Sequence, residues 1–173
     1  GSGSITYKTE AQGSDAIPQA PTSPTRTGYT FIGWSLNSSA AAGDASVLVN
    51  GALTVYAVWQ VNNFRVTYHP NGGLGASVSK FVPFNADAIP QAPITPVRDG
   101  YTLLTDAPKP PFGWSLNSSA AAADASASVT GAMTLYAVWR LNTYLVTYDP
   151  NGGPGSVVTK SENHNSDAIP QAP

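Results

Sequence analysis

The sequence predicts a mainly β fold, with short helical turns, built from small modules in tandem. Three observations predict it. Short segments of strand-like alternation are spaced regularly along the 173 residues. Sixteen glycines and 15 prolines separate them, as in chains with many turns. Several blocks of sequence recur at a fixed offset, which is the signature of a repeat architecture.

The recurring blocks define the repeat. The blocks "GWSLNSSAAA", "YAVW" and "VTYxPNGG" each occur twice, 80 residues apart. The block "DAIPQAP" occurs three times, at 15–21, 87–93 and 167–173, and its first two copies are 72 residues apart. The second repeat therefore carries eight additional residues. They fall within "LLTDAPKPP", which interrupts the segment that reads "YTFIGW" in the first repeat.

These offsets divide the chain into four segments. Residues 1–4, "GSGS", are typical of a cloning scar, and residues 5–62 form a first repeat that lacks its opening strand. Residues 63–142 form a complete second repeat with an inserted loop at about 103–111, and residues 143–173 form a truncated third repeat. We expect a slice of a longer array. Its orphan strand at 144–149 matches the strand that the first repeat lacks, which predicts strand-swapped self-association or fraying.

Within the complete repeat, "FRVTYH" at 64–69 alternates aromatic and β-branched residues with polar ones and predicts a half-buried strand. Asn71 and Gly72 then supply the positive φ of a hairpin turn, so a second strand should follow at about 77–84. The same pattern returns at 144–149, followed by Asn151 and Gly152.

The rest of the repeat combines turns with two further strands. The prolines of "DAIPQAP" exclude a strand or a long helix, and Asp15 is placed to cap one helical turn with Ile17 inward. "YTFIGW" predicts a third strand. "ALTVYAVW" at 52–59 predicts a last strand, with Leu53, Val55, Ala57 and Trp59 on one face.

The spaced motif P-x-R-x-G-Y-T-F-x-G-W, followed by Y-A-V-W and V-T-Y-x-P-N-G-G, resembles the internalin-type B-repeat, also called the Listeria–Bacteroides repeat. The matching residues are Pro24, Arg26, Gly28, Tyr29, Phe31, Gly33, Trp34, Tyr56 and Trp59, then 66–73, and in the second repeat Pro96, Arg98, Gly100, Tyr101, Gly113, Trp114, Tyr136 and Trp139. The resemblance implies β-grasp-like (ubiquitin-like) modules of a large bacterial surface protein, acting as stalks or interaction modules without enzyme chemistry. The insertion departs from the family pattern.

Composition and motifs exclude several function classes. The net charge is −2 without a basic cluster, so no nucleic-acid partner is expected. Residues 51–61 form the longest apolar stretch, which is too short and polar for membrane insertion. His69 and His164 are the only histidines, and neither recurs at its matching position. Nucleophile-elbow, zinc-protease and phosphate-loop motifs are absent. We therefore expect no enzyme, no catalytic residue, no cofactor and no metal site.

Three sets of recurring residues allow a second interpretation. The tryptophans are interpreted as core residues, with sugar stacking as the alternative. The aspartates of the turns are interpreted as capping residues rather than as calcium ligands, because calcium needs a cluster of about six to eight oxygens. The aligned lysines are interpreted as solvated edge residues, with a Lys–Asn isopeptide cross-link as the alternative. The lysines are Lys8, Lys80 and Lys160.

The inserted loop is the candidate ligand-binding site, represented by Leu104, Asp106, Lys109 and Pro110. A tolerated neutral insertion is the other interpretation. The leading hypothesis for function is a non-catalytic repeat stalk or protein-interaction module at the bacterial cell surface, with neighbouring repeats as partners. The alternative is an adhesin segment that recognises a host glycan or protein through this loop. A third class is an accessory module of a secreted polysaccharide-degrading enzyme.

Overall fold

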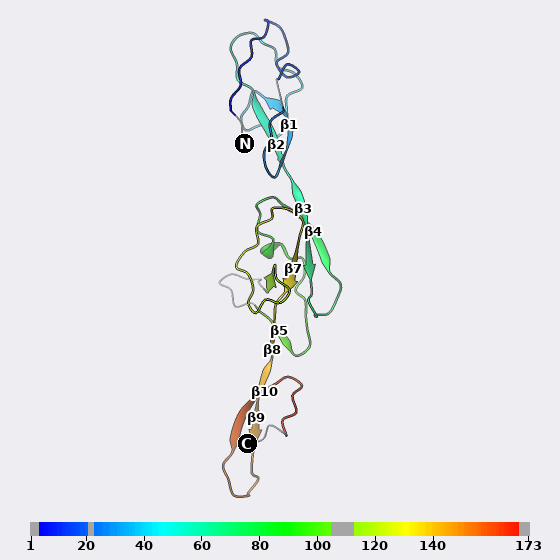
Figure 1. The fold of residues 1–173 in the computed structure, drawn as a ribbon, viewed down its shortest axis with the longest axis vertical. Coiled ribbons are helices and arrows are strands. Elements are labelled where there is room, and N and C mark those ends of the chain that lie inside the picture. The colour runs from blue at the N-terminus through cyan, green and yellow to red at the C-terminus, as the bar shows by residue number, and fades with distance from the viewer. Residues whose placement is uncertain (1–3, 21–22, 105–112, 170–173) are drawn as a thin grey trace. The chain divides into compact units, whose positions relative to one another are not determined.

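The computed structural model describes residues 4–20, 23–104 and 113–169 (Figure 1). The chain forms two compact units. Unit 1 comprises Gly1–Phe64 with Pro83–Ala86, and unit 2 comprises Arg65–Val82 with Asp87–Pro173. Across the described residues the regular elements are ten strands and one 3-10 turn, η1 (Ile89–Gln91). The predicted mainly β class is confirmed.

The complete repeat is organised around a four-stranded sheet of order β4-β3-β7-β6. Its strands are β3 (Asn63–His69), β4 (Val78–Pro83), β7 (Met133–Ala137) and β6 (Trp114–Ser115). The central pair is parallel, from Val66 opposite Met133 to His69 opposite Tyr136. The opening strand of the repeat therefore lies beside β7, from the last part of the repeat, in the middle of the sheet.

The core of unit 2 lies against this central pair. Val66, Tyr68 and Leu135 are fully buried, and the Tyr68 ring meets the indole of Trp114 edge-on at 5.3 Å between centroids. The Tyr68 hydroxyl donates to the carbonyl of Ala88 at 2.6 Å. Burial raises the pKa of Tyr68 to about 12, and the nearby Asp87 carboxylate contributes to the rise. The neutral phenol is the form that fits this site.

In the first two "DAIPQAP" blocks the aspartate holds the turn that follows it, although only the second block contains a helical turn, η1. Asp87 Oδ1 accepts from the N–H groups of Ile89 at 3.1 Å and Ala127 at 2.9 Å. Asp15 Oδ1 accepts in the same way from Ile17 at 3.0 Å and from Val47 at 2.9 Å. Each carboxylate thus ties its turn to a distant segment of the same repeat, which explains why an aspartate recurs there.

The third and last segments of each repeat pair in an antiparallel ladder. In unit 1, β1 (Tyr29–Ser35) pairs with β2 (Tyr56–Val61), and the register shifts between Phe31 and Gly33. Unit 2 divides the same ladder into β5 (Tyr101–Leu103) with β8 (Trp139–Leu141), and β6 with β7. The pairs on both sides of the division match those of unit 1. The insertion therefore occupies the position of a β-bulge and leaves the pairing unchanged.

The predicted last strand is wrong at its start. Residues 53–55 are outside any strand, and β2 begins at Tyr56. The predicted alternation also fails, because Val58 is 3% exposed whereas Leu53 is 39% exposed. The bulge between Phe31 and Gly33 changes which side chains face inward. In unit 2 the corresponding residues 133–135 do form a strand, because β3 pairs with them.

The hairpins form at the predicted Asn-Gly pairs. Asn71 and Gly72 have φ of 50° and 87° and form a β-turn, closed by the Gly73 N–H donating to the Pro70 carbonyl at 2.9 Å, within the connection of residues 70–77. Asn151 and Gly152 repeat this with φ of 49° and 85°. The turn at Asn151 lies between β9 (Thr143–Tyr148) and β10 (Val158–Asn163), which pair in antiparallel register.

Candidate functional site

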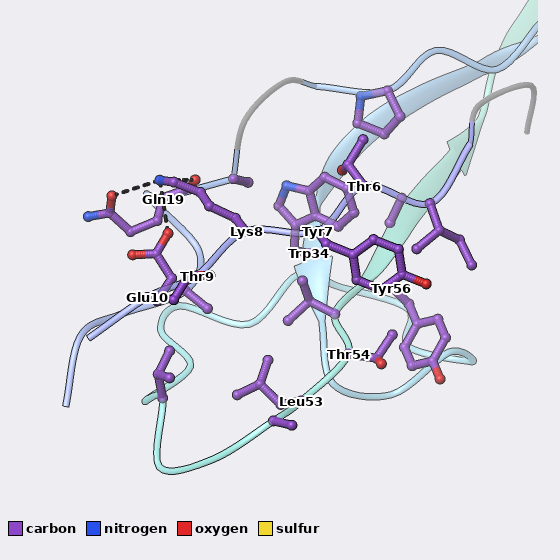
Figure 2. A pocket seen from close by; sticks show the side chains of 18 of the residues that line it. Thr6, Tyr7, Lys8, Thr9, Glu10, Gln19, Trp34, Leu53, Thr54 and Tyr56 are labelled. Carbon is purple, nitrogen blue, oxygen red and sulfur yellow. Dashed lines mark hydrogen bonds and ion pairs between the residues drawn. The ribbon is translucent and has the colours of Figure 1, made fainter. Parts of the chain in front are cut away.

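Unit 1 contains an open groove of about 1290 Å³. Residues 4–10 line one side and residues 49–57 line the other, with the indoles of Trp34 and Trp59 contributing to the wall. Figure 2 shows Thr6 to Glu10 across the opening from Leu53 and Thr54. Both sides are backbone segments that belong to no strand, except for the last residues of the second side. The groove therefore lies mainly between two segments that form no strand ladder with each other.

The polar end of this groove is held by Lys8. Its Nζ donates to the main-chain oxygen of Gln19 at 2.9 Å and lies 2.9 Å from the Glu10 carboxylate (Figure 2). Lys80 makes the matching contact with the side chain of Gln91 at 3.1 Å. The structure thus places two of the three aligned lysines against glutamine rather than the asparagine that the isopeptide hypothesis requires.

A second recurring constellation lies where one repeat meets the next. In unit 1 the main-chain N–H of Asn62 donates to the carbonyl of Gly28 at 2.9 Å, and Phe84 N–H donates to the carbonyl of Asn62 at 2.8 Å. The Thr30 hydroxyl donates to Asn62 Oδ1 at 2.6 Å. The ring of Phe84 lies edge-on to Tyr29 at 6.2 Å. We call these contacts the first junction.

Unit 2 repeats this arrangement at the second junction, with His164 in the place of Phe84. Asn142 N–H donates to Gly100 at 2.9 Å, His164 N–H donates to Asn142 at 2.9 Å, and the Thr102 hydroxyl donates to Asn142 Oδ1 at 2.6 Å. The imidazole is 6.1 Å from the Tyr144 ring. Its Nε2 is buried without a hydrogen-bond partner, 3.5 Å from an Asp99 oxygen.

Glycine is required at both junctions. Gly28 has φ of +76° and Gly100 has φ of +71°, which L side chains rarely adopt. A Cβ at Gly28 would overlap the ring of Phe84, and one at Gly100 would overlap His164. Sequence reasoning missed the junctions as sites. The sequence signal for them is the recurrence of Asn62 as Asn142, together with the recurrence of Gly28 as Gly100.

The predicted ligand-binding loop lies mostly outside the described residues. Asp106, Lys109 and Pro110 are among residues 105–112, for which no structure is described. Leu104 is described, and its N–H donates to the carbonyl of Val138 at 2.9 Å. The loop therefore leaves the ladder directly after a main-chain hydrogen bond.

The tryptophans occupy related but unequal sites. Trp114 is 1% exposed and belongs to the core, as predicted. Trp34 and Trp59 are half-buried against the Phe31 ring, at 5.4 and 5.7 Å between centroids. Trp139 is also half-buried and donates through Nε1 to the carbonyl of Pro70 at 3.0 Å. These contacts explain each indole by packing.

The groups that could carry chemistry are dispersed. Among the described residues, no three His, Asp or Glu side chains lie together as a metal site would require. His69 Nδ1 accepts from the N–H of Asn71 at 2.9 Å, so this imidazole stabilises the hairpin turn. In the described ranges no helix is long and apolar enough to cross a membrane.

Comparison with known proteins identifies related sequences. Residues 1–58 and 64–138 each match the Listeria-Bacteroides repeat domain. A protein of Evansella cellulosilytica named as a Gly-rich membrane protein is 30% identical over 161 residues, which cover 87% of this chain and 17% of that protein. Internalin H of Listeria monocytogenes is 28% identical over 94 residues, 53% of this chain and 16% of its own length.

The chain spans only a small part of these relatives. A second membrane protein of Evansella cellulosilytica is 29% identical over 148 residues, which are 80% of this chain and 20% of that protein. No solved structure matches the chain. The comparisons therefore concern one repeat-containing region of much longer proteins.

Proposed function

Because the chain belongs to the Listeria–Bacteroides repeat family, we propose that it is a non-catalytic stalk segment of a bacterial cell-surface protein. The observation that carries this proposal is the repeated junction. At each junction one main-chain hydrogen bond joins successive repeats, from Phe84 to Asn62 and from His164 to Asn142, and two further bonds hold the asparagine within its own repeat. A stalk needs a connection of this kind, because each repeat must be restrained by the next one. Surface location is supported by the names of the relatives.

The strand order supports a β-grasp-like module. The order β4-β3-β7-β6, with β3 and β7 parallel in the centre, joins the two ends of the repeat within one sheet. The crossover between the hairpin and the later strands contains η1 rather than a long helix. We propose that each repeat is a reduced version of this fold.

The stalk proposal predicts that Phe84 restrains the first junction. Replacing Phe84→Ala removes the ring that contacts Gly28 and Tyr29 and should cost about 2 kcal/mol in this half-buried site. Residues 83–86 belong to unit 1 but lie between two stretches of unit 2 along the chain. Hydrogen exchange at the amides of Asn62 and residue 84, which form the junction bonds, should be faster in this variant than in the unaltered chain.

The matched control for this experiment is Phe81→Ala. Phe81 lies on the same strand, β4, and is 70% exposed. This substitution removes the same ring without touching the junction, so exchange of the two junction amides should remain as in the unaltered chain. Equal effects of the two substitutions, or none from either, would contradict the role of the junction in the stalk.

A second candidate function is ligand binding through the inserted loop. The observation that favours it is the unchanged strand pairing on both sides of the insertion, which gives the loop a fixed base, as binding loops commonly have. The test is a glycan and matrix-protein array probed with the chain and with a variant lacking residues 104–111. Binding that disappears in the folded variant supports this function, and no binding by either form contradicts it.

A further inference from the structure

The groove of unit 1 corresponds to the position of β3 in unit 2. Residues 53–57 match residues 133–137 through the 80-residue offset, and in unit 2 those residues form β7, which pairs in parallel with β3. Residues 5–10 match residues 77–82 through the 72-residue offset, and these contain most of β4, the other neighbour of β3. Both neighbours of one central strand are therefore present in unit 1 around a gap.

Exposure shows that the groove lacks this strand's packing. Trp34 is half-buried, although its counterpart Trp114 is 1% exposed. On the other side of the groove Glu10 is half-buried, although its counterpart Val82 is fully buried. Trp34, Leu53 and Val55 give the groove an apolar lining that would favour burial of a strand.

Strand β9 has the sequence and the free edge that this gap requires. It reads "TYLVTY" where β3 reads "NFRVTYH", and its hairpin continues with the same "PNGG" turn. Among the described residues β9 is paired with β10 alone. Val146 and Tyr148 are only half-buried, whereas their counterparts Val66 and Tyr68 are fully buried. The buried contacts that β3 makes in unit 2 are therefore missing both from β9 and from the groove of unit 1.

The turn after β3 also shows how a donor would be fixed. Asn71 Nδ2 donates to the carbonyls of Ser118 at 2.8 Å and Ala137 at 2.9 Å, and Trp139 Nε1 donates to Pro70 at 3.0 Å. Each residue in these hydrogen bonds has a counterpart either in the hairpin of β9 and β10, which we call the donor, or in unit 1. The donor supplies Pro150 and Asn151, and unit 1 supplies Ser38, Ala57 and Trp59.

We propose that the groove of unit 1 binds strand β9 of a second copy of this chain, parallel to residues 53–57 and antiparallel to residues 5–10. The register of β3 on β7 places Val146 opposite Leu53 and Tyr148 opposite Val55. Groove and donor strand are different surfaces, so the contact is head-to-tail and repeats from copy to copy. The proposal does not depend on the stalk function.

The test is the mass of the 173-residue chain in sedimentation velocity over a range of concentrations. We expect the average mass to rise with concentration. Val146→Arg should weaken association by about tenfold or more, because it places a charge against the apolar groove. The matched control is Leu145→Arg, which changes the opposite face of β9 and restores the arginine found at the corresponding Arg65 of β3. The control should associate like the unaltered chain.

A peptide of residues 143–154 gives an independent readout. It should dissociate the assembly of the unaltered chain and bind the Val146→Arg chain, whose groove is intact. Hydrogen exchange should then slow at residues 5–10 and 53–57, while a peptide with aspartate in place of Val146 and Tyr148 has no effect. A chain that stays monomeric at every concentration and does not bind the peptide overturns the proposal. Association that is insensitive to both Val146→Arg and the peptide also overturns it.

Discussion

The hydroxyl of Tyr68 links a hydrogen bond to the pH dependence of stability. Its pKa is raised to about 12 by burial, with a further contribution from Asp87, whereas a tyrosine in an unfolded chain ionises near pH 10. Between these values the folded state binds more protons than the unfolded state. The contribution of neutral Tyr68 to the free energy of unfolding is therefore complete below about pH 10, and it is lost as the pH rises toward about 12.

Tyr68→Phe should separate the contribution of the hydrogen bond from the contribution of the raised pKa. At neutral pH we expect a loss of about 1 to 3 kcal/mol, because the buried carbonyl of Ala88 loses its donor. Between about pH 10 and 12 the variant should lack a decline of about 2 to 3 kcal/mol that the unaltered chain shows. Urea unfolding followed by tryptophan fluorescence at both pH values measures this.

The control for Tyr68 is Tyr148→Phe. Tyr148 donates to the carbonyl of Ala168 at 2.8 Å, but its side chain is only half-buried. Its replacement should cost less at neutral pH and leave the alkaline decline unchanged. An alkaline decline that persists in Tyr68→Phe would show that another group causes it.

The β-bulge in the β1–β2 ladder explains how the fold accepts an insertion. Its two halves keep their pairing in unit 2, with Tyr101 opposite Leu141 on one side and Trp114 opposite Ala137 on the other. A register shift already occurs at this point in unit 1, so additional residues need not break a hydrogen-bonded pair. Lengthening a loop also costs little, because closure entropy grows only with the logarithm of its length.

Removal of residues 104–111 should therefore leave unit 2 folded. The deletion restores the spacing of unit 1, with Phe112 at the position of Ile32, and we expect its free energy of unfolding to change by less than about 1 kcal/mol. Hydrogen exchange in β5 and β8 is the measurement. Loss of protection in both strands would show that the inserted residues stabilise the ladder.

Local pattern predicted the hairpins but not every strand. Alternation and the Asn-Gly pairs identified β3 and β9, because both signals depend on neighbouring residues. The state of residues 53–55 depends instead on a parallel partner far away in the sequence, so the same pattern forms a strand in unit 2 and no strand in unit 1. Local pattern therefore does not predict the groove, although the repeat offsets predict that the first repeat lacks its opening strand. The junctions were missed because Asn62 and Gly28 are also distant in the sequence.

Across the chain as a whole, two junctions of one design differ in a single ring. Phe84 packs between Tyr29 and Phe64 at the first. At the second, His164 occupies the equivalent place with a buried Nε2 that lacks a hydrogen-bond partner. A buried polar atom without a partner reduces stability. The first junction should therefore be the more stable of the two.

His164→Phe should make the second junction equal to the first. We expect a gain of about 1 kcal/mol or more, because a buried unpartnered nitrogen is replaced by carbon. Slower exchange of the amides of Asn142 and residue 164, which form the junction bonds, would be the direct sign. Faster exchange would mean that Asp99, 3.5 Å from the imidazole, contributes a stabilising charge interaction.

The parallel pairing of β3 and β7 has a mechanical consequence. The chain enters the complete repeat at the start of β3 and leaves it beyond the end of β7, so a pull on the two ends slides these strands past each other. The evenly spaced hydrogen bonds from Val66 to His69 are then loaded together rather than opened one after another. Resistance to tension would thus be set by the rate at which this one ladder shears. A repeat of modest thermodynamic stability could still withstand a brief force.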